Sequence, residues 1–265
     1  MKKILMENTP KKSTVKRALR STSYLLLLLL AIYHVPTANA QEGTVTYEEV
    51  IKLDIELPPE MAHMADEIPN SRTNTQILYF NESAALLKNA PEPTEDEVNM
   101  PGQSGMIRIQ MNREENEFFF DFNEDRKIQK RDFMGRVFLI EDEASTISWR
   151  LGNEKSEFLG YMCQKATATV DSTTYEAWFT PEISVPAGPG TGGLPGLILV
   201  LNIDDGQRSY VAQELSLGPI EKGIITPPKK GKKVTKAEFN AIVAEKMKEM
   251  EVNSGGNRFV IRTRN

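Results

Sequence analysis

The chain of 265 residues has 32 basic and 37 acidic residues, a net charge of −5, and 40% hydrophobic residues. These values are typical of a globular protein and exclude collagen-like, coiled-coil, wholly disordered and multi-span membrane proteins. A single cysteine, Cys163, excludes an internal disulfide and a multi-cysteine zinc site. We expect this thiol to be buried as a small hydrophobic side chain.

Residues 1–40 have the pattern of a cleaved secretory signal. Basic residues precede an apolar run at 24–33, and the small residues Ala38 and Ala40 come just before Gln41. The run is too short for a stable membrane anchor, which needs about 20 residues. We therefore expect cleavage after Ala40 and export to the periplasm or the outside of the cell, with an uncleaved anchor as the alternative.

Removal of this segment would change the charge of the chain. Residues 1–40 contain seven basic residues and one acidic residue, so the remainder has 25 basic and 36 acidic residues and a net charge of −11. Such an acidic chain repels phosphate backbones, and we expect no nucleic-acid partner. No later apolar run is long enough to span a membrane.

The remainder of the chain predicts short strands between turns. Apolar and polar residues alternate, or apolar residues cluster, over 44–55, 76–80, 106–111, 117–122, 127–133, 137–140, 147–151, 158–170, 175–180, 197–203 and 208–215. Breaks are expected at 152–153 and 171–172, and Asp204-Asp205-Gly206 predicts a hairpin turn. Because no helical periods lie between the strands, we expect a mainly β fold with a single antiparallel sheet, which could curve into a half-barrel.

A C-terminal helix is predicted after a basic linker. Thr235 and Glu238 form a capping box at its start. Its apolar stripe, which would make it amphipathic and dock on the sheet or on a partner, consists of Phe239, Ile242, Val243, Met247 and Met250. The predicted organisation is a signal peptide at 1–40, an antiparallel β domain at 41–226, and a linker, helix and tail at 227–265.

No catalytic constellation is recognisable. The segment 188–193 matches the glycine spacing of dinucleotide-binding loops, but no helix is predicted after it, so we interpret it as a turn that enters a strand. His63 is the only histidine after residue 40, and no nucleophile motif accompanies it. We predict no catalytic residue and no cofactor. A hydrolase that uses carboxylates such as Asp204 and Asp205 is kept as an alternative.

Met61, His63 and Met64 are weak candidates for a metal site. Thioethers and imidazole are soft ligands that suit Cu(I). The same segment could form a turn whose methionines pack on the core, and we prefer this interpretation. A metal-binding protein, with Cys163 as a further ligand, therefore remains an alternative, and no metal site is predicted.

The segment Gly193-Leu194-Pro195-Gly196-Leu197-Ile198 is the signature that gives the GLPGLI family its name. Further segments that resemble this family are 160–166, 177–183, 188–189, 45–48, 79–81 and 235–239. The resemblance implies a protein that Bacteroidota-type bacteria export and whose function is unknown. The chain lacks the aromatic residue that the family has just before the signature. A weaker resemblance of the strand pair with Tyr161 and Trp178 is to LolA-like half-barrel envelope proteins.

The half-barrel resemblance implies a concave apolar face that suits a hydrophobic ligand. The strand at 197–203 is apolar on both sides, so a helix, a loop or a ligand should cover each side. The predicted ligand-binding residues are Tyr161, Trp178, Gly193, Leu194, Pro195, Gly196, Leu197 and Ile198. The alternative is that the aromatic residues only fill the core.

These observations favour a non-enzymatic exported protein, although they do not decide the question of catalysis. The expected partner is a hydrophobic small molecule or an envelope protein. The alternatives are a carboxylate-based hydrolase of the envelope and a periplasmic metal-binding protein. The sequence predicts no particular oligomeric state.

Overall fold

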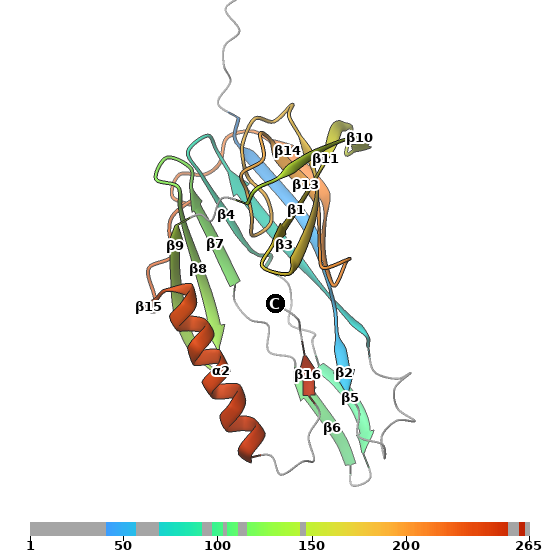
Figure 1. The fold of residues 1–265 in the computed structure, drawn as a ribbon, viewed down its shortest axis with the longest axis vertical. Coiled ribbons are helices and arrows are strands. Elements are labelled where there is room, and N and C mark those ends of the chain that lie inside the picture. Colours follow the sequence, from blue (N-terminus) through green and yellow to red (C-terminus); the bar gives the residue numbers. More distant parts are fainter. Residues whose placement is uncertain are drawn as a thin grey trace, which may run out of the picture. The chain divides into compact units, whose positions relative to one another are not determined.

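The computed structural model describes residues 41–56, 69–91, 97–102, 105–110, 116–143, 147–253 and 260–262. Twelve of the described strands form one sheet (Figure 1). They are β1 (Gly43–Lys52), β3 (Ser71–Phe80), β4 (Ala84–Asn89), β7 (Asn116–Asp121), β8 (Arg126–Phe133), β9 (Arg136–Glu143), β10 (Arg150–Phe158), β11 (Tyr161–Val170), β12 (Thr173–Thr180), β13 (Leu197–Ile203), β14 (Arg208–Leu217) and β15 (Lys232–Val234).

The strand order in this sheet is β10-β11-β12-β13-β14-β1-β3-β4-β7-β8-β9-β15. The sheet is open, with β10 and β15 at its two ends, and it is antiparallel except where β15 runs parallel to β9. Two short antiparallel pairs lie apart from it: β2 (Asp54–Glu56) with β16 (Val260–Arg262), and β5 (Glu97–Gly102) with β6 (Gly105–Gln110). The helix α2 (Lys236–Asn253) follows β15. The predicted mainly β fold with one antiparallel sheet and a C-terminal helix is confirmed.

At the hairpin of β10 and β11, two predicted boundaries are wrong. The predicted strand at 158–170 is interrupted by a turn, in which Leu159 and Gly160 have φ angles of 52° and 81°. Two successive positive φ values are typical of a type I′ hairpin turn. The predicted break at 152–153 lies inside β10, where the pairing register shifts between Leu151 and Lys155. The glycine there marks an irregularity within a strand and not its end.

The strand β4 was not predicted, because its residues do not alternate. Ala84, Ala85, Leu86 and Leu87 are all buried. Ala85 and Leu87 belong to one apolar cluster, whereas Ala84 and Leu86 belong to another with Phe119 and Ile128. Since neighbouring side chains of a strand point to opposite faces of the sheet, β4 is covered on both faces.

The start of α2 has the predicted capping box. The backbone N–H of Thr235 donates to Oε2 of Glu238 at 2.8 Å, and the backbone N–H of Glu238 donates to Oγ1 of Thr235 at 3.2 Å. Phe239 is buried, and its ring centroid lies 5.3 Å from that of Phe138 and 6.0 Å from that of Phe133. The predicted stripe thus docks on the chain's own sheet near the helix start.

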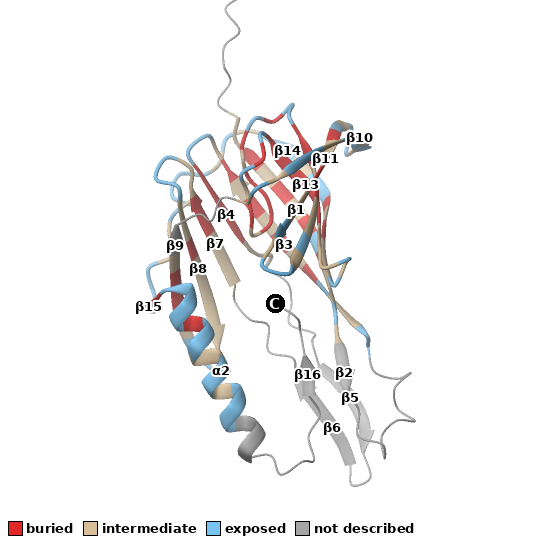
Figure 2. Ribbon diagram, in the orientation of Figure 1, coloured by how far each residue is buried: buried red, intermediate tan, exposed pale blue. Residues whose placement is uncertain are grey.

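Along the strands of the sheet, buried residues lie next to partly exposed ones (Figure 2). On β12, Ala177 and Phe179 are buried, and they alternate with Glu176 and Trp178, which are partly exposed. We name the face of Ala177 the loop face, because the segment 181–196 packs on it, and we name the opposite face the polar face. The cluster that includes Ala177 also contains Ile183, Val185, Ala187 and Leu194 from that segment.

Several predictions lie outside the described residues, namely the signal peptide at 1–40 and the segment with Met61, His63 and Met64. The boundary between a β domain that ends at residue 226 and a C-terminal part from 227 stays a prediction. Cys163 is buried, as predicted. Among the residues that the structure describes, no helix has both the length and the apolar character that crossing a bilayer requires.

Candidate functional site

The signature segment lies mostly inside the large apolar cluster. Leu194, Leu197 and Ile198 are buried, whereas Gly193 and Pro195 are exposed. A Cβ atom on Gly196 would come within 2.1 Å of the carbonyl oxygen of Thr180, so only glycine fits there. Both sides of the strand from Leu197 to Leu201 are covered by the chain's own residues.

The segment 181–196 is held on the loop face by direct hydrogen bonds. Lys127 Nζ donates to the carbonyl oxygen of Gly190 at 2.8 Å, and Trp149 Nε1 donates to that of Gly192 at 3.0 Å. The backbone N–H of Ile198 donates to the carbonyl oxygen of Ala187 at 2.9 Å. The segment is therefore part of the packed structure, and its assignment to a ligand site stays a prediction.

Trp178 and Tyr161, the two predicted aromatic site residues, are both partly buried at the border of this cluster. The centroid of the Trp178 ring lies 5.7 Å from the centroid of the Phe158 ring. Lys165 Nζ lies 5.9 Å from the Trp178 centroid. Trp178 thus belongs to the polar face, away from the signature segment on the loop face. The structure does not bring all predicted site residues to one surface.

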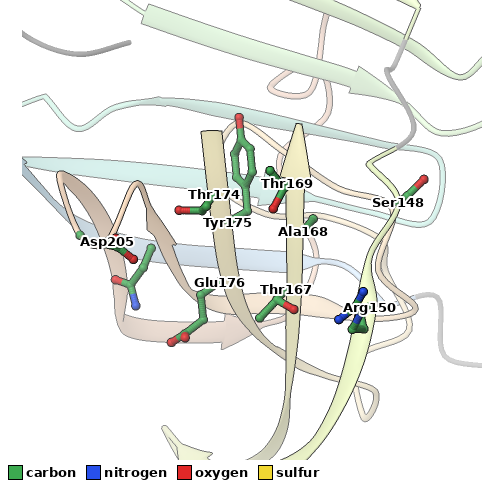
Figure 3. Close-up of a pocket in the computed structure, with 11 residues that line it drawn as sticks. Ser148, Arg150, Thr167, Ala168, Thr169, Thr174, Tyr175, Glu176 and Asp205 are labelled. Carbon is green, nitrogen blue, oxygen red and sulfur yellow. The ribbon is translucent and has the colours of Figure 1, made fainter. Parts of the chain in front are cut away.

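A polar pocket of about 880 Å³ lies where β10, β11 and β12 adjoin the turn between β13 and β14 (Figure 3). It is lined by Ser148, Arg150, Thr167, Ala168, Thr169, Thr174, Tyr175, Glu176, Asn202, Asp205 and Gly206. Hydroxyl, amide, carboxylate and guanidinium groups all contribute to this lining. The pocket can therefore donate and accept hydrogen bonds with a polar ligand.

Four polar side chains of this pocket form a row across neighbouring strands. In the register of the sheet, Arg150 of β10 lies opposite Thr167 of β11. Thr167 lies opposite Glu176 of β12, which in turn lies opposite Asn202 of β13. Since directly opposed residues share one face of a sheet, the row lies on the polar face, on the same side as Trp178.

An ion pair stabilises the centre of the row. Lys165 Nζ lies 2.8 Å from Oε2 of Glu176. The hydrogen bond from Lys165 and its charge hold the pKa of the Glu176 carboxyl below its ordinary value, although partial burial acts in the opposite direction. Hydrogen bonds with Trp178 and Asn202 lower this pKa further. The same hydrogen bond raises the pKa of Lys165. Both groups are charged at neutral pH, so the pair adds no net charge to the pocket.

The predicted hairpin turn at Asp204-Asp205-Gly206 is confirmed, with φ angles of 49°, 51° and 80°. Asp204 Oδ1 accepts a hydrogen bond from the backbone N–H of Thr174 at 3.0 Å, so this carboxylate has a structural partner. Asp205 lines the pocket, and it takes part in no ion pair with another described residue. The two aspartates therefore do not act as a pair.

Arg150, Thr167 and Glu176 were missed as site residues because they come from three strands whose pairing the sequence does not show. The alternation in 173–180 could have placed Glu176 and Trp178 on one side. Among the described residues, no three histidine, cysteine or acidic side chains are grouped so as to hold a metal ion.

A family model with the description "N-glycanase peptide, N-terminal domain" matches residues 72–216. Two structures of PNGF-II, in the P21 and C2 space groups, are 15% and 18% identical to this chain, each with a TM-score of 0.50. Each match covers 78% of this chain. The matches cover 34% and 33% of the two PNGF-II chains, respectively. The chain thus spans about a third of the length of PNGF-II, and at this identity the likeness shows the fold alone.

An uncharacterised conserved protein from Thermus thermophilus is 8% identical, with 79% of this chain and 99% of that chain covered. Its TM-score of 0.39 is too low to support a conclusion. No curated protein matches the chain.

The resemblance to the GLPGLI family and to LolA-like proteins is wrong. The matched family model includes residues 193–198 and assigns them to a different family, and two of the similar solved structures are those of PNGF-II. The expectation of a Bacteroidota-type source rested on the resemblance and falls with it. Close packing explains the motif itself, since Leu194, Leu197 and Ile198 are core residues and Gly196 touches the backbone of Thr180. Such a short packing motif does not define a family by itself.

Proposed function

Because the chain belongs to the family described as "N-glycanase peptide, N-terminal domain", we propose that it is a glycan-binding domain that performs no catalysis itself. The observation that supports this proposal is the polar pocket with the row Arg150, Thr167, Glu176 and Asn202. The family description names an N-glycanase, so a glycan is the ligand class that agrees with it.

The chemistry of the polar face suits a saccharide. Sugar hydroxyl groups both donate and accept hydrogen bonds, and the pocket offers carboxylate acceptors, guanidinium donors and an amide that does both. Trp178 lies two residues from Glu176 on the same side of β12 and adds an aromatic surface next to these polar groups. Ligand sites commonly combine such an apolar surface with a few polar groups that orient the ligand.

The charge state of Glu176 supports binding over cleavage of a glycosidic bond. A carboxyl group that donates a proton to a leaving group needs a raised pKa. The hydrogen bond from Lys165 lowers the pKa of Glu176 instead. Glu176 is thus suited to accept hydrogen bonds from hydroxyl groups as a carboxylate that is ionised at neutral pH.

In the experiment, the chain from Gln41 onward is first screened on a glycan array. The glycans that bind are then titrated into it, and calorimetry measures the affinity. We expect Glu176→Gln and Trp178→Ala each to weaken binding by about 1.5–3 kcal/mol, or roughly ten- to 150-fold. The matched control is Glu141→Gln, which breaks a similar 2.8 Å ion pair with Lys233 at the other end of the sheet. Glycan binding that Glu176→Gln leaves unchanged, or the absence of any glycan binding, would refute the proposal.

A hydrophobic small molecule or an envelope protein is the second candidate partner. It is supported by three exposed apolar side chains of the β10–β11 hairpin, Leu151, Leu159 and Met162, which are 50%, 43% and 46% exposed. The signature strand is already covered on both sides, so a ligand there would have to displace the segment 181–196. A native mass spectrum that shows only the polypeptide would count against a retained hydrophobic ligand.

A further inference from the structure

Among the residues that the structure describes, one cationic and one anionic group of the pocket lining have no charged partner. Lys165 neutralises Glu176 at 2.8 Å, which leaves Arg150 and Asp205 as the remaining charges of the lining. Neither takes part in a hydrogen bond or ion pair between side chains of the described residues. The guanidinium of Arg150 can therefore bind an anionic group of a ligand.

Arg150 and Asp205 lie at different ends of the pocket lining. Arg150 is the first residue of β10, the end strand of the sheet, and Asp205 lies in the turn after β13. In Figure 3 the Arg150 side chain lies beside Thr167, and Asp205 lies on the far side of Glu176. Adjacent strands are about 4.8 Å apart, so the three steps from β10 to β13 separate the ends by roughly 14 Å.

We propose that the pocket binds a saccharide with a single acidic group, a carboxylate or a sulfate, and that Arg150 holds this group. A guanidinium donates two parallel hydrogen bonds to such an anion. Thr167, Glu176 and Asn202 then face the neutral hydroxyl groups of the same ligand. Asp205 accepts hydrogen bonds from hydroxyl groups at the far end and repels a second acidic group there. This inference rests on the proposed glycan binding and adds the class of glycan.

The test compares neutral glycans with their singly sialylated and singly sulfated forms, first on an array and then by calorimetry. We expect at least one acidic form, carboxylate or sulfate, to bind about tenfold more tightly than its neutral form, a preference that weakens with added salt. In Arg150→Gln this preference should disappear, because the affinity for the acidic form falls further than the affinity for the neutral form.

The matched control is Arg136→Gln, because Arg136 is likewise exposed and begins a strand, β9. Its preference for the acidic glycan should equal that of the unchanged chain. Equal binding of neutral and acidic forms, or a preference that survives Arg150→Gln, overturns this inference and leaves the proposed glycan binding intact. If no glycan binds at all, both fail.

Discussion

Glu49 is a buried carboxylate at the centre of the sheet, and it is only 4% exposed. Its Oε2 accepts hydrogen bonds from Asn74 Nδ2 and Gln76 Nε2, both at 2.9 Å, and its Oε1 accepts one from the hydroxyl of Tyr210 at 2.7 Å. Arg208 Nε lies 3.8 Å from the same Oε1. Burial and the charge of Glu49 raise the pKa of Tyr210, so the hydroxyl remains a donor. The network joins β14, β1 and β3.

The substitution Glu49→Gln should lower the free energy of unfolding by about 2–4 kcal/mol. The amide nitrogen would replace one of the two acceptor oxygens, so its N–H groups would face either the donors of Asn74 and Gln76 or the hydroxyl of Tyr210. Urea unfolding followed by circular dichroism measures the loss. Glu141→Gln, at a more exposed ion pair, should cost less than about 1 kcal/mol. Equal losses for the two variants would contradict the role of the buried network.

At the scale of elements, the start of α2 is attached to the sheet by the buried Phe239, with Ile242 and Val243 packed against the same cluster. Phe239 packs on Phe138 and Phe133 of β9 and β8, and the guanidinium of Arg131 lies 5.5 Å from its ring centroid. Further along the helix, Met247 is 42% exposed. The helix is therefore held near its first turns.

The substitution Phe239→Ala should release α2 from the sheet, with a loss of about 3–5 kcal/mol in docking free energy. The rest of the sheet should keep its stability, because the large cluster on the loop face does not include Phe239. Hydrogen exchange of the amides in 236–249 would show faster exchange in this variant than in Met247→Ala. Uniformly faster exchange in all strands would show that the helix stabilises the whole domain.

At the scale of the whole molecule, the predicted cleavage after Ala40 would make Gln41 the first residue of the exported chain. The side chain of Gln41, the expected first residue, already has partners, since its Nε2 donates to the carbonyl oxygen of Glu182 at 3.0 Å. Its Oε1 accepts a hydrogen bond from the backbone N–H of Ser184 at 2.5 Å. The fold can thus begin at this residue without loss of these contacts.

The protein recovered from its native cells should therefore begin at Gln41. The mass of the intact protein and sequencing of its N-terminus measure this directly. Ala40→Arg should block the cleavage, because signal peptidases need a small residue before the cut. An unprocessed chain with residues 1–40 in place would contradict the predicted signal.

The sequence by itself determined the elements whose signals are local. The apolar run at 197–203 coincides with β13, the Asp-Gly turn lies at 204–206, and Thr235 with Glu238 caps α2 as predicted. These signals depend on residues within a few positions of each other. The turn at Leu159-Gly160 was missed because leucine is an unusual residue at a positive φ.

Only the tertiary structure decided the candidate site and the role of the signature segment. The row from Arg150 to Asn202 exists because four strands pair in one register, which long-range burial selects. The segment 181–196 could have left the apolar strand open to a ligand, but it folds back and its own side chains enter the core. The apolar run shows that both sides of this strand must be covered. It cannot show what covers them, since a loop, a helix and a ligand bury apolar surface equally well.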